Sequence, residues 1–126
     1  MDKQISPGLN KTFLAHSIVG AIFGFVLLLV PDVIGTISGQ PIIETIAYRG
    51  IGAAVLAFAT SSWLSYKEES WDKVKIVVQM EIVWTTLFVV VSVYGILSGQ
   101  LPAMDWMNVI IVGGFGITFA IFYFRS

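Results

Sequence analysis

The chain has 126 residues, of which 56% are hydrophobic and only 12% are charged, and its formal net charge is −1. Soluble domains carry about 25% charged residues, and so few charged side chains cannot cover this much apolar surface. The mean hydropathy of +0.86 agrees. The composition therefore excludes a soluble globular domain, a disordered chain and a nucleic-acid binder with a basic face. It indicates an integral membrane protein.

Few residues carry reactive chemistry. The chain has no cysteine, which excludes disulfides, thiolate metal sites and cysteine nucleophiles. Its single histidine, His16, cannot form a two-histidine metal or haem site within one chain. No nucleophile–base pair or phosphate-binding loop is recognisable. We therefore predict no catalytic residue, no metal and no cofactor, and we expect that the protein is not an enzyme.

Four apolar stretches define the predicted fold, and they cover residues 13–30, 45–64, 74–97 and 106–124. A spanning helix needs about 20 residues, and only helices satisfy their own backbone groups within one segment in hydrocarbon. A soluble bundle would keep a polar face with a period near 3.6 residues, whereas these stretches are apolar all around. Because the loops are short, neighbouring helices should be antiparallel. The sequence predicts an all-α, four-helix transmembrane bundle that forms one domain.

The basic residues are sorted to one side of the predicted spans. Six of the seven lie in the tail, in or beside the loop after the second span, or after the last span: Lys3, Lys11, Lys67, Lys73, Lys75 and Arg125. The opposite loops, 31–44 and 98–105, contain no Lys or Arg. Positively charged loops stay in the cytoplasm. We therefore expect both termini to be cytoplasmic, in a plasma-membrane protein whose immediate partner is the lipid bilayer and not nucleic acid.

A short motif recurs at an offset of 60 residues. Gly35-x-x-Ser38-Gly39-Gln40 follows the first span and Gly95-x-x-Ser98-Gly99-Gln100 follows the third, each shortly before a proline. One interpretation is a duplication, which would give two parallel hairpins related by an axis along the membrane normal. The alternative is that both helices need a Gly/Ser stop before a proline, because glycine tolerates the left-handed conformation there. The sequence leaves both readings open.

Small residues mark the predicted helix-packing faces. Such residues allow helix backbones to approach closely, since lipid provides no hydrophobic drive between helices. They recur on one face of the first, second and fourth spans, namely Gly20 and Gly24, then Ala53 and Ala57, then Gly113, Gly116 and Ala120. We expect these faces to pack within the bundle. The alternative is that one of them, on the fourth span, forms a homo-oligomer interface.

Arg49 is one of two charged residues that lie well inside a predicted span, the other being Glu81. A charge inside the hydrocarbon costs at least ~2.5–3.5 kcal/mol, which makes such a residue a candidate for function. A long arginine side chain can extend toward the membrane surface. We therefore expect the guanidinium to reach Glu44, Asp32 or Asp105 on the outer side. The role of Arg49 is then either functional or structural.

Glu81 belongs to a predicted polar seam on the third span. Glu81, Thr85 and Ser92 lie within about 40° of one another on a helical wheel, which should turn them toward the bundle interior. Depth estimates place His16 at the level of Glu81, so we predict a hydrogen bond between the two side chains. This bond is either a proton-titrating pair or a structural contact that holds the first span to the third.

The segment Ala47-Tyr48-Arg49-Gly50-Ile51-Gly52-Ala53 opens the second span after a proline-containing loop. An Arg followed by Gly at this place resembles a pattern in small uncharacterised four-span membrane protein families of bacteria and archaea. The resemblance covers the first two spans, and it implies the same four-span topology without a particular activity.

The sequence as a whole favours a non-catalytic membrane component, which assembles as a homo-oligomer or beside a larger membrane partner. The alternative is a small transporter or channel, with or without coupling to protons, in which Arg49, Glu81 and His16 lie along a polar path.

Overall fold

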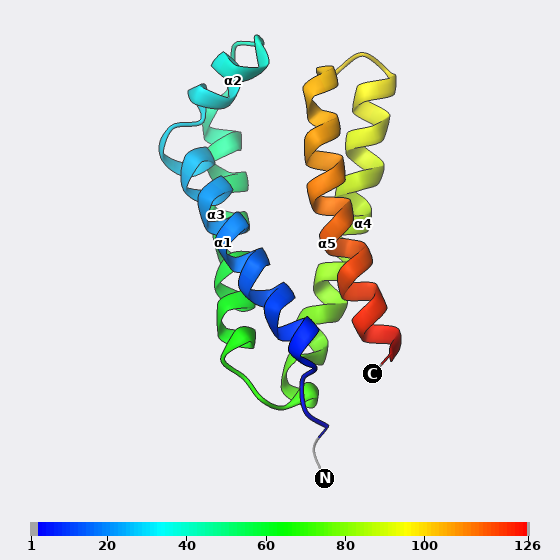
Figure 1. Ribbon diagram of the computed structural model, residues 1–126. Coiled ribbons are helices and arrows are strands. Elements are labelled where there is room, and N and C mark those ends of the chain that lie inside the picture. Colours follow the sequence, from blue (N-terminus) through cyan, green and yellow to red (C-terminus); the bar gives the residue numbers. More distant parts are fainter. Residues whose placement is uncertain (1–2, 126) are drawn as a thin grey trace. The chain divides into compact units, whose positions relative to one another are not determined.

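The computed structural model describes residues 3–125, and these form helices joined by short connections (Figure 1). In chain order the elements are α1 (Pro7–Leu29), α2 (Asp32–Ser38), α3 (Thr45–Tyr66), α4 (Trp71–Leu97), the 3-10 turn η1 (Ala103–Asp105) and α5 (Trp106–Arg125). Within the described range, extended pairing is limited to one isolated bridge between Gln4 and Ser70. The predicted all-α fold class is confirmed.

Three segments are long and apolar enough to cross a membrane, namely α1, α4 and the segment Ala103–Arg125. This finding supports the prediction of a membrane protein with transmembrane helices. Helix α3 is not in this group, because it contains Arg49 and a run of hydroxyl residues, Thr60 to Ser62, that lower its hydropathy.

Helix α1 begins at Pro7, six residues before the predicted span. The Ser6 hydroxyl oxygen accepts a hydrogen bond from the Leu9 amide at 3.2 Å. Serine is a favoured N-cap, and proline suits the first helical position because its missing N–H would have no partner there. Ser6 and Pro7 are therefore a helix start. Helix α4 also begins early, at Trp71.

The predicted outer loop 31–44 contains a short helix, α2, that the sequence reading did not anticipate. Pro31 separates α2 from α1, because proline lacks the N–H that would continue the backbone hydrogen bonds of α1. The Val33 and Ile34 amides donate instead to the carbonyls of Val30 and Pro31, at 3.1 and 3.0 Å. The first apolar segment is thus a long helix with a break and a short helical extension.

The chain divides into two compact units. The α1–α3 unit comprises Phe13–Tyr66, and the α4–α5 unit comprises the residues up to Thr12 together with those from Lys67 onward. Each unit contains a pair of long helices connected through the region of the repeated motif.

In the α1–α3 unit, glycines set a close, antiparallel helix contact. A Cβ atom on Gly20 would lie 3.0 Å from the Ala59 Cβ, and one on Gly24 would lie 2.7 Å from the Leu56 Cγ. Gly52 of α3 is closer still, because its Cβ would lie 2.6 Å from the Leu28 amide nitrogen. Positions further along α1 therefore contact positions earlier in α3. Gly20 and Gly24 lie at this contact, as the small-residue pattern predicts.

The buried face of α3 differs from the predicted one. Gly52, Ala59, Ser62 and Ser65 are buried, whereas Ala53 and Ala57 are exposed. The Ala53/Ala57 stripe is therefore not the face that packs within this unit. Side-chain size alone did not identify the packed face, because Gly52, Ala59, Ser62 and Ser65 are also small.

In the α4–α5 unit, the two helices form an antiparallel hairpin (Figure 1). A Cβ on Gly116 would lie 3.0 Å from the Thr85 Cβ, and one on Gly113 would lie 3.5 Å from the Val89 Cγ2. Gly113 and Gly116 thus face α4, while Ala120 is half-buried. Near the ends of the hairpin that hold the start of α4 and the end of α5, the Gln79 amide donates to the Tyr123 hydroxyl at 2.9 Å.

The N-terminal segment is hydrogen-bonded to the start of α4 within this same unit. The Trp71 amide donates to the Lys3 carbonyl at 2.7 Å, and the Ile5 amide donates to the Glu69 carbonyl at 3.0 Å. This antiparallel pairing around Gln4 and Ser70 ties the chain before α1 to the chain before α4. The two helices therefore begin at the same end of the unit.

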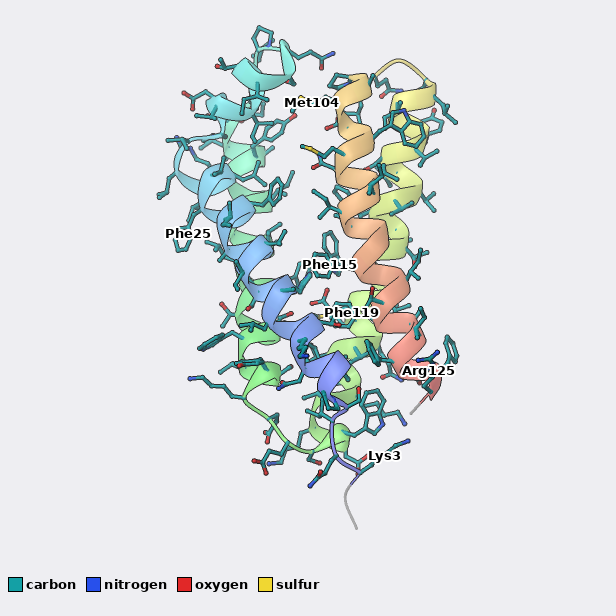
Figure 2. The ribbon with its side chains drawn as sticks, viewed as in Figure 1. Lys3, Phe25, Met104, Phe115, Phe119 and Arg125 are labelled. Carbon is teal, nitrogen blue, oxygen red and sulfur yellow. The ribbon has the colours of Figure 1, made fainter. Side chains whose placement is uncertain are left out.

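The end of α5 lies at that end too. Gly8, in the first turn of α1, faces the Phe122 ring and leaves no room there for a Cβ. Figure 2 shows Lys3 and Arg125 at one end of the unit and Met104 at the other.

The two copies of the repeated motif have the same local conformation. Gly39 and Gly99 have positive φ angles of 72° and 77°, which glycine adopts without strain. The Ser38 hydroxyl donates to the Gly35 carbonyl at 3.3 Å, and the Ser98 hydroxyl donates to its counterpart, Gly95, at 3.2 Å. The motif therefore ends a helix in both places, α2 in the first half and α4 in the second.

The glycine contact between α1 and α3 can be tested with two neighbouring substitutions. In Gly52→Ala the new methyl group meets backbone atoms that cannot move aside, so we expect a loss of roughly 1–3 kcal/mol in the free energy of unfolding. Gly50→Ala is the control, because no atom lies within 4 Å of a Cβ there and alanine favours helix. Unfolding of the purified protein in detergent measures both. Equal stability of the two variants would contradict the contact.

Candidate functional site

Arg49 binds the end of α1. Its guanidinium Nη1 donates to the Leu28 carbonyl at 2.6 Å and to the Leu29 carbonyl at 3.4 Å. The last carbonyls of a helix have no partner within the helix, and here Pro31 removes a further donor. The positive charge also complements the negative end of the helix dipole. Within the α1–α3 unit, Arg49 therefore acts as a side-chain cap for α1.

Within the described part of the α1–α3 unit, Arg49 forms no ion pair with Glu44 or Asp32, so these two predicted partners were wrong, whereas Asp105 lies in the other unit and stays a prediction. The hydrogen bonds of Arg49 go to carbonyls, whereas the Glu44 carboxylate accepts from the Ile46 amide at 3.2 Å and the Asp105 carboxylate accepts from the Asn108 side chain at 3.0 Å. Both carboxylates thus accept hydrogen bonds from groups near the start of a helix, α3 for Glu44 and α5 for Asp105. Carboxylates that water can reach are already solvated, whereas unpaired backbone carbonyls at a broken helix end are costly to bury. The guanidinium therefore binds the carbonyls.

His16 joins the two helices of the α1–α3 unit. Its Nδ1 is 2.7 Å from the Ser62 hydroxyl oxygen, and both side chains are buried. The sequence reading missed Ser62. The available signal was the three-residue spacing of Ala59, Ser62 and Ser65, which places all three on one face of a helix. This hydrogen bond connects α1 to α3 near the end opposite to Arg49.

The predicted polar seam of α4 is buried along its length. Glu81, Thr85 and Ser92 have exposed fractions of 0%, 1% and 5%. The Glu81 carboxylate accepts a hydrogen bond from the Trp84 indole N–H at 2.7 Å, and the Thr85 hydroxyl donates to the Glu81 carbonyl at 2.7 Å. The spacing of three residues between Glu81 and Trp84 places their side chains side by side on the helix.

The candidate residues fall into two groups. Glu81, Thr85 and Ser92 lie together in the α4–α5 unit, while His16 and Arg49 lie near opposite ends of the α1–α3 unit. The expected hydrogen bond between His16 and Glu81 would join the two units, and it stays a prediction. Among residues 3–125, no cluster of three or more His, Cys, Asp or Glu side chains could hold a metal ion.

A shallow apolar groove runs between α1 and α3, with a volume of about 470 Å³ and a lining that includes Ala21, Ala59 and Trp63. The hydroxyls beside it are bound to their own backbone, since Ser17 donates to the Leu14 carbonyl and Thr60 to the Leu56 carbonyl. The groove therefore offers hydrocarbon-like surface without a charged group, and it suits lipid chains better than a polar solute.

Among the buried polar side chains of residues 3–125, the Glu81 carboxylate can hold a proton, whereas His16 and Ser62 connect two helices. No family model, curated protein or solved structure matches the chain.

The capping role of Arg49 predicts a local effect. In Arg49→Met the two carbonyls lose their donor, so we expect the last turn of α1 to open more often and the amides of residues 26–33 to exchange at least about tenfold faster. Glu44→Gln is the control, because its carboxylate does not bind the guanidinium, and it should leave this exchange unchanged. Hydrogen exchange followed by mass spectrometry measures both. An equal increase in amide exchange in Glu44→Gln would indicate that this carboxylate binds the guanidinium, and would contradict the capping role of Arg49.

Proposed function

We propose that the protein is a four-span integral membrane protein, built as an antiparallel four-helix bundle like the bacterial and archaeal families that residues 47–53 resemble. The pairing of residues 3–5 with residues 69–71 carries this proposal. Because α1 and α4 start at the same end, a chain that crosses the membrane in α1 must return before α4. Helix α3 is the connecting helix that can make this crossing.

The dimensions and polar contacts of α3 are compatible with a span. Its 22 residues extend about 33 Å at 1.5 Å per residue, against a hydrocarbon core of about 30 Å. Its most costly polar groups have partners, since Arg49 binds carbonyls of α1 and Ser62 binds His16. The Thr60 and Ser61 hydroxyls donate to carbonyls of α3 itself. Its low hydropathy therefore does not oppose insertion beside α1.

The offset of 60 residues supports a duplicated hairpin. Applied to α3, Thr45–Tyr66, it gives residues 105–126, which nearly coincide with α5, Trp106–Arg125. The contact between Gly24 and Leu56 would correspond to positions 84 and 116, and Gly116 packs against Thr85, one residue away. The first hairpin would then have acquired the break at Pro31 that the second lacks. This arrangement is the 2+2 parallel repeat of the sequence prediction.

The basic residues support one orientation. All six that the sequence places on one side belong to the α4–α5 unit, and Lys3 and Arg125 mark its common end (Figure 2). The positive-inside rule places this end in the cytoplasm, with the plasma membrane as the location.

The role that the contacts support best is that of a non-catalytic membrane component. The polar side chains of the spans bind helices to one another, as in the pairs His16 with Ser62 and Gln79 with Tyr123. Helix α5 offers a surface for assembly, because only 6% of its apolar window is buried and Gly114 has no atom within 4 Å of a Cβ. The chain would associate through this surface with a second copy or with a larger membrane partner.

Cysteine labelling tests the topology, and the absence of native cysteine makes single-cysteine variants simple to interpret. A membrane-impermeant thiol reagent should label Lys67→Cys only from the side that also labels Lys11→Cys. It should label Thr36→Cys and Gln100→Cys only from the opposite side. Labelling of Lys67→Cys from the side of Thr36→Cys would show that α3 does not cross, and would overturn the four-span proposal.

The second candidate function is a small proton-coupled transporter, and it is favoured by one observation. Glu81 has no exposed surface and lies within a candidate span. A carboxyl group there is costly, and such residues commonly belong to proton or ion pathways or pair with another polar group. A polar path along Glu81, Thr85 and Ser92, extended by His16 and Arg49, would carry the proton or solute.

Proton flux separates the two candidates. In reconstituted liposomes with an imposed pH gradient, the structural role predicts no flux above that of protein-free liposomes. Glu81→Gln should then alter stability or assembly alone. The matched control is Thr86→Ala, because Thr86 is exposed and its hydroxyl donates only to the Ile82 carbonyl of the same helix. Proton flux that is lost in Glu81→Gln and kept in Thr86→Ala would favour the transporter.

A further inference from the structure

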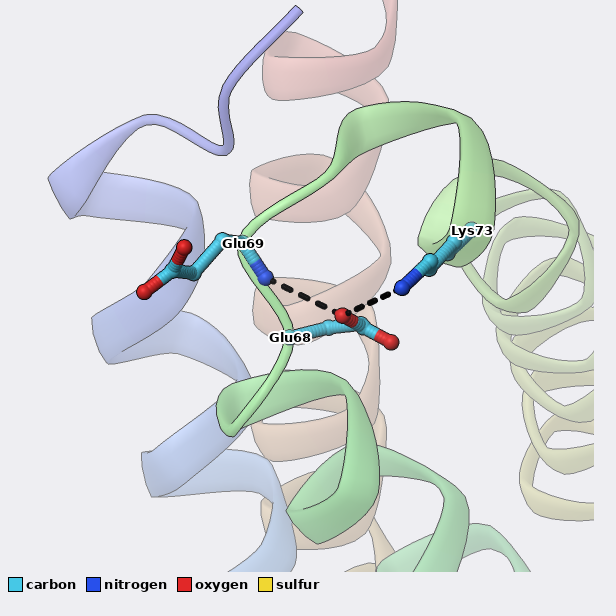
Figure 3. A network of polar contacts seen from close by, with 3 residues as sticks. All are labelled: Glu68, Glu69 and Lys73. Atoms are coloured by element: carbon cyan, nitrogen blue, oxygen red, sulfur yellow. Dashed lines mark hydrogen bonds and ion pairs between the residues drawn. The ribbon is translucent and has the colours of Figure 1, made fainter. Parts of the chain in front are cut away.

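The common end of the α4–α5 unit, hereafter the basic end, carries an excess of positive charge. Its basic residues are Lys3, Lys11, Lys67, Lys73, Lys75 and Arg125, and the acidic residues beside them in the start of α4 and the preceding loop are Glu68, Glu69 and Asp72. One of these charges is neutralised locally. Lys73 and Glu68 form an ion pair at 3.2 Å, and the same carboxylate oxygen accepts from the Glu69 amide (Figure 3).

Lys75 and Arg125 differ from Lys73. Both side chains are exposed, and neither forms an ion pair within the described part of the chain. Lys75 precedes Gln79 by one turn of α4, and Arg125 follows Tyr123 at the end of α5. Because Gln79 binds Tyr123 across the hairpin, both cations lie within about one turn of that hydrogen bond along the helix axes, toward the basic end. Lys75 shares the face of Gln79, whereas Arg125, two residues after Tyr123, leaves another side of α5 and reaches this level of the surface through its long side chain.

The surface next to this hydrogen bond changes from polar to apolar in a short distance. Tyr123 also packs near the Trp71 ring, with centroids 6.1 Å apart, and such aromatic rings favour the level of the lipid headgroups. Further along α4, away from the basic end, Met80, Val83 and Leu87 are exposed. Cations, hydrogen-bonding groups and apolar side chains therefore follow one another in the order of phosphate, ester and acyl chain in a phospholipid.

We propose that this face of the α4–α5 hairpin binds an anionic phospholipid, whose phosphate contacts Lys75 and Arg125 and whose chains lie along the apolar face of α4. The inference rests on the proposed membrane location and adds a lipid class to it. Charge complementarity identifies the occupant, because basic residues at the cytoplasmic surface attract anionic headgroups. Arginine and lysine are also the side chains that bind phosphate oxygens best.

Asp72 is the opposing charge on this face. It lies one turn before Lys75 in α4, it is exposed, and it makes no ion pair with Lys75 in the described range. Its carboxylate should repel a phosphate at Lys75. Removal of the Asp72 charge should therefore strengthen the binding of an anionic lipid. The variant Asp72→Asn thus tests the inference by a gain of lipid binding rather than by a loss.

Native mass spectrometry of the full chain in neutral detergent, titrated with phosphatidylglycerol or phosphatidylcholine, tests the inference. We expect phosphatidylglycerol to bind at least about tenfold more tightly than phosphatidylcholine. The double variant Lys75→Gln/Arg125→Gln should lose this preference without a change in phosphatidylcholine binding, and Asp72→Asn should increase it. Lys73→Gln is the matched control, because Lys73 is already paired with Glu68, and it should change binding less than about threefold.

Two results would overturn the inference. One is an unchanged lipid preference in the double variant, and the other is an equal loss in Lys73→Gln, which would indicate diffuse charge rather than this face. Competition by inorganic phosphate or glycerol phosphate at the concentration of the lipid would assign a free anion instead, and this too contradicts a lipid site. If the double variant fails to fold, the same lipid titration is made with Lys75→Gln, which should weaken phosphatidylglycerol binding, and with Asp72→Asn, which should strengthen it. No change in either variant would overturn the inference. Cysteine labelling that supports four spans, together with absent lipid preference, would reject this inference alone.

Discussion

Hydrocarbon contains no water to satisfy a polar group, so every polar atom inside a span needs a partner from the protein. This constraint explains the least expected contact in the molecule, the binding of the Arg49 guanidinium to the carbonyls at the end of α1. Pro31 ends that helix within an apolar region and leaves carbonyls without donors. A cation on the neighbouring helix supplies the donor and at the same time complements the helix dipole. The charge that seems most costly in the sequence thereby stabilises a broken helix.

The same constraint determines how the helices are held together. Lipid tails are as apolar as leucine, so helix contact depends on close packing and on hydrogen bonds between helices. Gly24 and Gly52 bring the backbones of α1 and α3 together, and Gly116 does so for α5 against α4. A close approach then places His16 within reach of Ser62. Helix packing and hydrogen bonding therefore depend on each other, because the glycines allow the two helices to come close enough for His16 and Ser62 to form a hydrogen bond.

The sequence predicted the helices well and their contacts less well. The hydropathy pattern places α3 and α5 to within two residues, because a long apolar run has few alternative structures. It misplaced the start of α1, where Ser6 and Pro7 form a cap that resembles a turn in sequence. The pattern of small residues also predicted Ala53 and Ala57 as the packing face of α3. Small side chains occur on two sides of this helix, and which side packs depends on the position of the partner helix, which the sequence does not give. The predicted polar seam around Glu81 is buried because its spacing follows the helix period, a local property that sequence reveals directly.

Two unrelated forces favour the same topology. The positive-inside rule favours a cytoplasmic location for the basic residues, and this expectation depends only on charge. Backbone hydrogen bonds join residues 3–5 to residues 69–71, and this contact depends on neither charge nor hydropathy. Both relate the start of α1 to the start of α4. An odd number of crossings between these points would separate segments that are hydrogen-bonded to each other. In the proposed topology, α3 is the helix that crosses the membrane despite its modest hydropathy, and the contacts of Arg49 with α1 and of His16 with Ser62 give its polar side chains partners there.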